Sequence, residues 1–452
     1  MRTERDSLDI IGRALAAADA DEADAVFVST DRNICRFANS SVHQNMSEVT
    51  ADLTLRVVIG GAIGVASTTT FDADGINRMV SLAREAARHS RPLPGFRGLY
   101  RGGDGAPSLR TFDAQTAEIA VADKARQLRA MFDRGREQAV DFAGSFTTAA
   151  MSVTCASTHG VQRYCRATSA DATVIAVGTK GSGYATTCGR SVGEVDIIAL
   201  GDEATAKATL CAGTSADLDP GAYDMIIEPA AIAEVLDWMN LITFSGQSFE
   251  DQSSFFVDNI GQQRLSAQLT LSDDSVDEDF LPFPFDLEGY ARQRVTLIDR
   301  GIIRTPVVDK AYADRLGIPP TGNCWHLGAP EHGTAFHLSI DPGDATRDEL
   351  LQSTRLGIWV TRFNYVNGLL DPRTALMTGT TRDGTFLIRD GEVAGRLPNL
   401  RWTQSMVEAF SNIERLTTER RRISTWYNPF GGTFAPAMKV RGWNITGKQV
   451  SS

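Results

Sequence analysis

Histidine is scarce in this chain, and cysteine is equally so. The 452 residues include six histidines and six cysteines, with no CxxC pair and no cysteine after Cys324. The Gly-x-Ser-x-Gly pattern around a serine nucleophile is also missing, which argues against serine hydrolase chemistry. In a chain of this size the cysteines are expected to be reduced, buried thiols.

Positive charge and long apolar runs are lacking too. Lys and Arg number 45 against 56 Asp and Glu, which gives a formal net charge of -11. Non-specific nucleic-acid binding rests on Lys and Arg that neutralise phosphates, so direct nucleic-acid binding is not expected. No stretch approaches the ~18 apolar residues of a membrane span. Residues 1–6 are charged and lead into an amphipathic helix rather than an apolar signal-peptide core, which predicts a cytoplasmic protein without membrane contact.

Helical and strand patterns alternate in the first ninety residues. Apolar residues recur at helical spacing over 7–20 and again over 72–89. Between these helices the sequence favours short strands, with Gly60-Gly61 as a hairpin turn. The expected strands are 25–28, 34–37, 53–59 and 63–66.

A second unit of the same kind follows. A helical pattern over 116–136 precedes strands that end, as in the first unit, in a Gly-rich turn and a strand closing on Thr-Thr. We interpret this as a degenerate internal repeat of 1–90 and 110–190, joined by a Gly- and Pro-rich linker at 91–110. Chance similarity between two hairpins is the alternative.

The chain is long enough for more than one domain. The best boundary lies near 215, which gives an N-terminal domain at 1–215 and a C-terminal domain at 216–452. The second half is rich in short strands and Gly turns, with helices expected at 230–241 and 399–416. Arg420, Arg421 and Arg422 are expected after the second helix, where they favour its C-terminal dipole.

These patterns predict an α+β fold. The N-terminal domain is expected to consist of repeated helix and antiparallel-sheet units. The C-terminal domain is expected to contain large antiparallel β-sheets with few helices.

Several short motifs recur in a fixed order after residue 221. The apolar strand at 221–227 runs into a helix, and Asp-Leu-Glu-Gly at 286–289, Ile-Asp-Arg-Gly at 298–301 and Thr-Gly-Asn at 321–323 follow. This order resembles the TldD/PmbA family of bacterial proteins. That family pairs a zinc metallopeptidase subunit, TldD, with a partner that lacks zinc, TldE or PmbA.

The resemblance fails at the residues that bind zinc. In the peptidase subunit of the family, His-Glu-x-x-x-His on the helix supplies two ligands and a general base, and a Cys near the C-terminus supplies the third ligand. The matching helix here offers only Glu228, Glu234 and Asp237, and the stretch 427–436 has no Cys. Glu234 and Asp237 are expected on a solvated helix face.

The resemblance therefore implies a TldE/PmbA-like subunit without zinc or catalysis of its own. It would form a heterodimer with a TldD-like zinc subunit, and the metallopeptidase complex would cleave small or unfolded peptides. This chain would contribute the substrate chamber and assembly. A homodimer is the alternative assembly.

A set of turn residues is the candidate substrate-binding surface. The alternative is that these residues only shape turns. The set comprises Asp286, Glu288, Gly289, Thr321, Gly322 and Asn323.

One further cluster carries potential chemistry, because thiolate, imidazole and carboxylate groups can bind zinc. It comprises Cys324, His326, Glu331, His332 and His337. A catalytic or metal role, a substrate contact and simple structural placement are all compatible with the pattern. The cluster motivates an alternative function, a diverged tailoring enzyme that acts on a small amide or peptide in a natural-product pathway. A third alternative is a binding protein that modulates gyrase or a toxin–antitoxin system.

Overall fold

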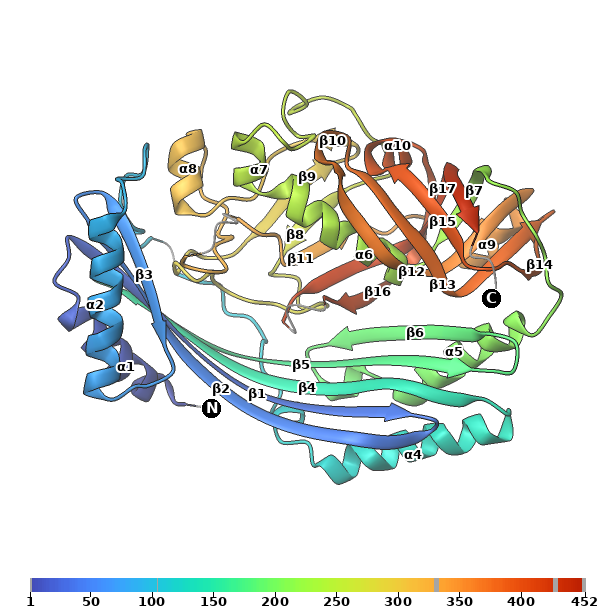
Figure 1. Ribbon diagram of the computed structural model, residues 1–452, viewed down its shortest axis with the longest axis horizontal. Coiled ribbons are helices and arrows are strands. Elements are labelled where there is room, and N and C mark those ends of the chain that lie inside the picture. The colour runs from blue at the N-terminus through green and yellow to red at the C-terminus, as the bar shows by residue number, and fades with distance from the viewer. Residues whose placement is uncertain (1, 104, 329–332, 426–429, 449–452) are drawn as a thin grey trace.

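The computed structural model describes residues 2–103, 105–328, 333–425 and 430–448. It contains two β-sheets. Helices pack on the first sheet, and other helices lie between and around the strands of the second sheet (Figure 1). The architecture is mixed α+β, as the sequence predicts. Over the described residues, no helix is both long and apolar enough to cross a membrane.

The first sheet is six-stranded and antiparallel, in the order β3-β2-β1-β4-β5-β6. Gly60 and Gly61 both have positive φ and form the predicted turn between β2 and β3. The strands predicted at 25–28 and 34–37 are one continuous strand, β1, because the polar stretch between them also pairs with β2 on one side and with β4 on the other. The strands are β1 (Glu22–Ala38), β2 (Ser41–Ile59), β3 (Ala62–Thr68), β4 (Asp141–Ser157), β5 (Gln162–Val177) and β6 (Ser182–Gly189).

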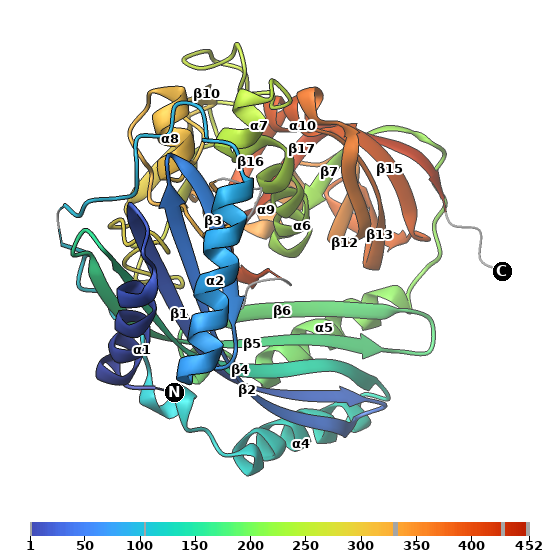
Figure 2. The same cartoon turned by 60° about the vertical axis from the view of Figure 1, so that its left-hand side comes forward.

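Helices cover the two ends of this sheet, and at each end they form a separate apolar core with the strands. Ile11 and Ala83 belong to the core that α1 and α2 form with β1 and β2, while Leu128 and Leu200 belong to the core under α4 and α5. Figures 1 and 2 show the two helix pairs at opposite ends of the long curved strands. The helices are α1 (Glu4–Ala17), α2 (Ala73–His89), α3 (Ala114–Ala117), α4 (Val121–Glu137) and α5 (Ile197–Cys211).

The second sheet is mixed rather than purely antiparallel, which corrects the expectation. β7 pairs in parallel with β12, and β11 pairs in parallel with β17, because helices and long loops connect these strands instead of tight turns. β17 pairs with both β15 and β7, so β7, β12, β13, β15 and β17 close on themselves. The main core lies here and includes Trp402 and Trp443.

The remaining strands and helices belong to the second half of the chain. Its strands are β7 (Gly221–Ile227), β8 (Leu271–Asp274), β9 (Arg294–Asp299), β10 (Ile302–Ile303), β11 (His337–Ile340), β12 (Leu356–Asp371), β13 (Leu376–Arg389), β14 (Glu392–Arg396), β15 (Leu400–Ser405), β16 (Ile413–Ser424) and β17 (Gly432–Lys448). Its helices are α6 (Pro229–Met239), α7 (Gly246–Glu250), α8 (Lys310–Leu316), α9 (Arg347–Gln352) and α10 (Met406–Ser411).

The helix predicted at 399–416 is wrong. Leu400 and Trp402 are buried and alternate with an exposed Arg401, so this segment is strand β15, which pairs with β13. Only α10 is helical, and it begins after the N-cap Ser405. Arg420, Arg421 and Arg422 consequently lie in strand β16 and not behind a helix.

Candidate functional site

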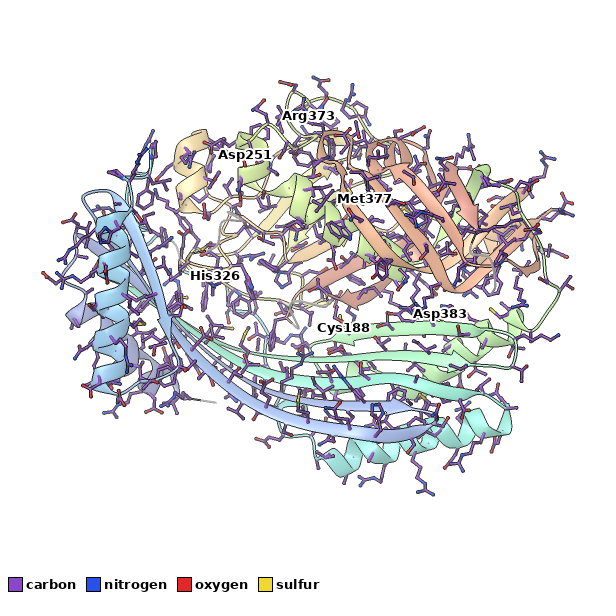
Figure 3. The ribbon with its side chains drawn as sticks, in the orientation of Figure 1. Cys188, Asp251, His326, Arg373, Met377 and Asp383 are labelled. Atoms are coloured by element: carbon purple, nitrogen blue, oxygen red, sulfur yellow. The ribbon has the colours of Figure 1, made fainter. Side chains whose placement is uncertain are left out.

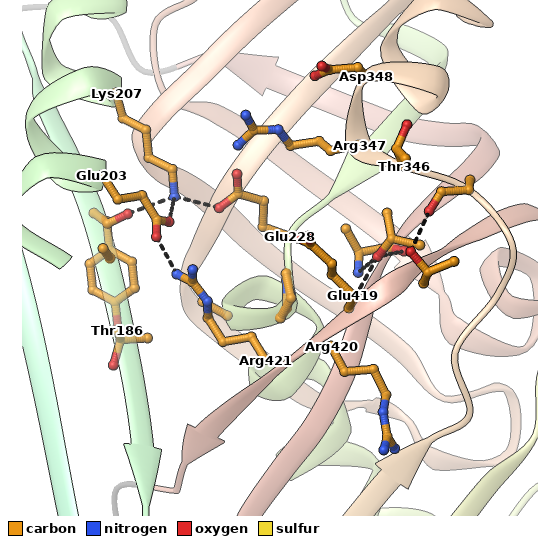
Figure 4. Close-up of a pocket in the computed structure, with 18 residues that line it drawn as sticks. Thr186, Glu203, Lys207, Glu228, Thr346, Arg347, Asp348, Glu419, Arg420 and Arg421 are labelled. Carbon is orange, nitrogen blue, oxygen red and sulfur yellow. Dashed lines mark hydrogen bonds and ion pairs between the residues drawn. The ribbon is translucent and has the colours of Figure 1, made fainter. Parts of the chain in front are cut away.

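A cleft of ≈ 440 Å³ lies between the first sheet with its helix α5 and the second half of the chain (Figure 4). β6 and α5 supply one wall. The start of α6, the first residues of α9 with the two residues before it, and strands β16 and β17 supply the other walls. The cleft therefore lies at the beginning of the helix where the resemblance places the zinc ligands of the peptidase subunit.

Local sequence explains why α6 starts at this point. The buried strand β7 ends at Ile227, and Pro229 occupies the first helical turn, where its fixed φ suits the helix and its missing N–H costs nothing. Glu228 stands at the N-cap position, but its side chain makes no capping hydrogen bond. Its carboxylate instead accepts from Lys207 Nζ at 2.6 Å and from Trp359 Nε1 at 3.0 Å.

Lys207 is the centre of an ion-pair network at the floor of the cleft. Its ammonium group donates to Glu203 at 2.7 Å, to Glu228, and to the carbonyl of Tyr184 at 2.9 Å, so all three donors have acceptors. Glu203 also accepts from Arg421 at 2.6 Å. Burial alone would raise the pKa of Glu203, but Lys207 and Arg421 outweigh it and lower that pKa. Two cations and two carboxylates thus join α5, the start of α6 and β16.

Arg347 differs from the other cations that line the cleft. Its guanidinium lies 5.4 Å from the ring centroid of Trp359, a cation–π contact that orients the side chain. Among the residues that the structure describes, Arg347 has no carboxylate partner, whereas Lys207 and Arg421 are paired. The rim also carries Asp348 and Glu419 (Figure 4). An incoming carboxylate group would find Arg347 available for a forked hydrogen bond.

The predicted substrate-binding residues do not line this cleft. They lie in two turns that the rest of the chain buries. Asp286 accepts from the backbone N–H groups of Glu288, Tyr290 and Cys324 at 2.9 to 3.0 Å, and Gly289 has a φ of +85° in the same turn. Gly322 likewise has a positive φ of +73°.

In the second turn, Thr321 both donates to and accepts from the backbone of Val308, and the side-chain amide of Asn323 donates to Asp273 at 2.7 Å. The structure brings the two turns together through the Asp286–Cys324 hydrogen bond. A substrate contact at these residues stays a prediction.

Arg56 connects these turns to the first sheet, and sequence analysis missed it. Its guanidinium pairs with Asp24 on the neighbouring strand at 2.5 Å and with Glu288 at 2.9 Å, and all three side chains are at most 8% exposed. The signal was present in the sequence, because Arg56 is the one charged residue of the largely apolar run at 53–59. A charge in a buried strand needs a partner.

Comparison with known proteins identifies the family. Residues 220–447 match the PmbA/TldA metallopeptidase C-terminal domain, and residues 23–87 match PmbA/TldA metallopeptidase domain 1. The chain belongs to the PmbA/TldD family.

Similarity to individual members is distant but extensive. The chain is 25% identical to the metalloprotease PmbA of Escherichia coli O157:H7 over 401 residues, which cover 84% of this chain and 83% of that protein. It is 22% identical to a metalloprotease of Methanothermobacter thermautotrophicus over 169 residues; there the chain spans 37% of the relative's length. The crystal structure of TldE from Thermococcus kodakarensis has the same fold, with a TM-score of 0.87, 17% identity, and coverage of 98% of this chain and 100% of that one.

The donors at α6 of this PmbA/TldD-family chain do not fit the zinc site of the peptidase subunit. The helix has no His or Cys, and its acids Glu234 and Asp237 are half-buried rather than fully solvated as expected. Burial raises the pKa of Glu234, an effect that Arg362 partly offsets. Within the described ranges, no group of three or more His, Cys, Asp or Glu side chains is placed to hold a metal ion.

The described members of the histidine cluster have separate surroundings. Burial raises the pKa of the Cys324 thiol, which packs with Phe283 and Phe285. His337 bonds to the carbonyl of Phe430 at 3.1 Å, and burial lowers the pKa of its imidazole to about 4.

His326 is exposed (Figure 3) and interacts electrostatically with Asp52 of β2. Glu331 and His332 lie outside the described residues. A catalytic, metal or substrate-binding role of this cluster stays a prediction.

Because burial shifts the pKa of Glu288, we expect the stability of the fold to depend on pH. Burial raises its pKa to about 8, an effect that Arg56 only partly offsets, whereas an unfolded chain releases this proton near pH ~4.3. Between these values the folded state holds a proton that the unfolded state lacks, so the free energy of unfolding falls as pH rises. The slope reaches at most about 1.4 kcal/mol per pH unit.

Urea unfolding at a series of pH values measures this slope. Burial also raises the pKa of Asp286, to about 6, so above that pH Glu288 dominates the change. The variant Glu288→Gln, which cannot ionise, is expected to flatten the profile between pH about 6.5 and 8. An unchanged slope in this variant would show that Glu288 is ionised in the fold throughout.

Proposed function

We propose that this chain is the TldE-like subunit of a two-subunit metallopeptidase whose zinc is held by a TldD-like partner. The observation that carries the proposal is the chemistry of α6. The family is one of metallopeptidases, yet the helix at the cleft offers neither His nor Cys, the ligands that a zinc hydrolase of this kind requires. The TldE-like fold over almost the whole chain supports the same assignment.

The cleft is the surface that this subunit would offer to peptides. Its volume suits a short peptide segment, and its floor is neutral because Lys207 and Arg421 are paired with Glu203 and Glu228. Arg347 is then the cation available to a peptide carboxylate, and charge-assisted hydrogen bonds of this kind are about twice as strong as neutral ones. In this proposal the chain binds and orients the peptide, and the partner's zinc would polarise the scissile carbonyl and activate water.

Metal content and peptidase activity, measured together, test the proposal. The chain is purified alone and after co-expression with a TldD-like gene from the same genome, and both preparations are assayed for zinc and for cleavage of an unstructured peptide. Zinc and cleavage are expected only in the co-purified complex. Stoichiometric zinc or turnover in the chain alone would overturn the proposal and favour a stand-alone tailoring enzyme. Failure to co-purify with any TldD-like subunit would equally contradict it.

A further inference from the structure

Lys207 lies in a cage of three oxygen atoms at the floor of the cleft (Figure 4). Its Nζ is 2.6 Å from Glu228 Oε2, 2.7 Å from Glu203 Oε1 and 2.9 Å from the carbonyl oxygen of Tyr184. The side chain of Lys207 is only 4% exposed. Carboxylate and carbonyl oxygens are also the ligands that hard divalent cations prefer. The ammonium group therefore occupies a position that is chemically suited to a metal ion.

Both carboxylates of this oxygen cage are held by a second partner as well. Oε2 of Glu203 accepts from Arg421 at 2.6 Å, and Oε1 of Glu228 accepts from the indole of Trp359 at 3.0 Å. Outer partners of this kind orient the groups that bind a cation. Because Arg421 belongs to β16 and Trp359 to β12, the orientation of the cage does not depend on Lys207 alone.

Close packing of α5 on β6 brings Lys207 to this position. A Cβ atom on Gly183 would lie 2.0 Å from the carbonyl oxygen of Ala204 and 2.7 Å from Cβ of Lys207. Glycine at 183 thus lets the helix approach the strand closely. The approach places the ammonium group against the carbonyl of the next strand residue, Tyr184.

We infer that Lys207 excludes divalent metal ions from the cleft, because its ammonium group occupies the cation position between Glu203 and Glu228. The ammonium is a compact charge with three donors, and the chain holds it in place. Without it, two carboxylates and a carbonyl would face one point, with Arg421 paired to only one of them. Ca²⁺ binds oxygen at about 2.3–2.6 Å, so a cage at 2.6–2.9 Å would need to contract by only about 0.3 Å.

This role of Lys207 goes beyond the loss of His and Cys from α6. Even without those ligands, the cleft contains two carboxylates that could take up a metal ion. The tethered ammonium prevents this and so confines metal to the partner subunit, a consequence that rests on the proposed function. The exclusion itself is a property of the single chain, so it is tested without a partner and can fail independently.

Terbium luminescence tests the exclusion in the full chain. Tb³⁺ binds oxygen sites that suit Ca²⁺, and it luminesces when a nearby indole transfers its excitation energy. Trp359 donates to Glu228 and would be that indole. Lys207→Ala is expected to bind Tb³⁺ at least about tenfold more tightly than the wild-type chain, and Ca²⁺ should compete with a Kd of about 10⁻⁴–10⁻³ M, as in weak protein sites.

Two matched variants separate the oxygen cage from a general effect of lost positive charge. Lys310 pairs with Asp314 on α8, away from the cleft, so Lys310→Ala should bind Tb³⁺ no better than the wild-type chain. In Lys207→Ala/Glu228→Gln the gained binding should disappear, because an amide supplies no negative charge. Equal gains in Lys207→Ala and Lys310→Ala would overturn the inference.

The fold of the variants is followed by circular dichroism in the same titrations. A folded Lys207→Ala chain with the Tb³⁺ affinity of the wild-type chain would also overturn the inference. If this variant unfolds in metal-free buffer, excess Ca²⁺ is expected to restore its fold, since a ligand that binds only the folded state stabilises it. Lys207→Ser serves as the second variant, and failure of Ca²⁺ to restore either chain would count against the inference. Failure to co-purify with a TldD-like subunit would contradict the proposed function alone.

Discussion

Replacement of Arg56 by methionine is expected to lower the free energy of unfolding by about 3–5 kcal/mol. Arg56 is the cation between Asp24 and Glu288, and both acidic side chains are buried at the contact between the first sheet and the turn at 286–289. Methionine fills a similar volume but leaves the Asp24 carboxylate without a counter-charge and Glu288 without its hydrogen-bond donor. Removal of one partner from a buried ion pair is costly because the remaining charge stays out of water. Urea unfolding of the full chain measures the loss.

An exposed arginine supplies the matched control. Arg126 forms an ion pair with Asp123 on the surface of α4, where its side chain is 74% exposed. Arg126→Ala should change stability by at most about 0.5 kcal/mol. The double variant Arg56→Met/Asp24→Asn should recover part of the loss, since the stranded carboxylate is gone. Equal effects of the Arg56 and Arg126 substitutions would show that the Arg56 cluster does not hold the two halves together.

Replacement of Arg347 by alanine is expected to reduce kcat/KM of the co-purified complex by about 10- to 100-fold for a short peptide with a free C-terminal carboxylate. This range corresponds to the loss of a hydrogen bond to a charged group, about 1.5–3 kcal/mol. The physical basis is the position of Arg347 in the cleft, oriented by Trp359 and unpaired among the described residues. The loss should appear mainly in KM, because the contact is made to the bound substrate before and during the reaction.

Two comparisons separate recognition from a general effect. Arg355 is an exposed arginine that follows the same helix α9 but does not line the cleft, so Arg355→Ala should leave kcat/KM unchanged. The same peptide with a C-terminal amide should be cleaved less well by the wild-type complex and should be insensitive to Arg347→Ala. A similar loss for the acid and the amide would contradict carboxylate recognition by Arg347.

Local patterns were sufficient for most of the first half. Period-2 alternation and the Gly60-Gly61 turn predicted the hairpin of β2 and β3, and the apolar spacing over 72–89 predicted α2. Both signals are short-range, since they depend on side chains a few residues apart. The helix predicted at 399–416 failed for the same reason. Strand β15 and helix α10 follow each other without a loop, and a short apolar run can satisfy either periodicity.

The composition of the cleft could not be predicted in this way. Lys207, Arg347 and Arg421 belong to α5, α9 and β16; Lys207 and Arg347 carry no local signal, and the arginine run that contains Arg421 gives no indication of its partner. Glu228 could be singled out at the start of α6, but its partners lie 21 and 131 residues away. Such pairs form only when sheet pairing brings distant elements together.

The family, the α+β class and the lack of His and Cys in α6 follow from residue identity and order along the chain. The contacts between charged side chains, such as Arg56 with Glu288 and Lys207 with Glu228, could be read only from the folded chain. The folded chain also shows which edge of the first sheet stays open, since β3 is shorter than β2. These outcomes depend on strand register and on packing between distant segments, which are set by the whole chain rather than by any local pattern.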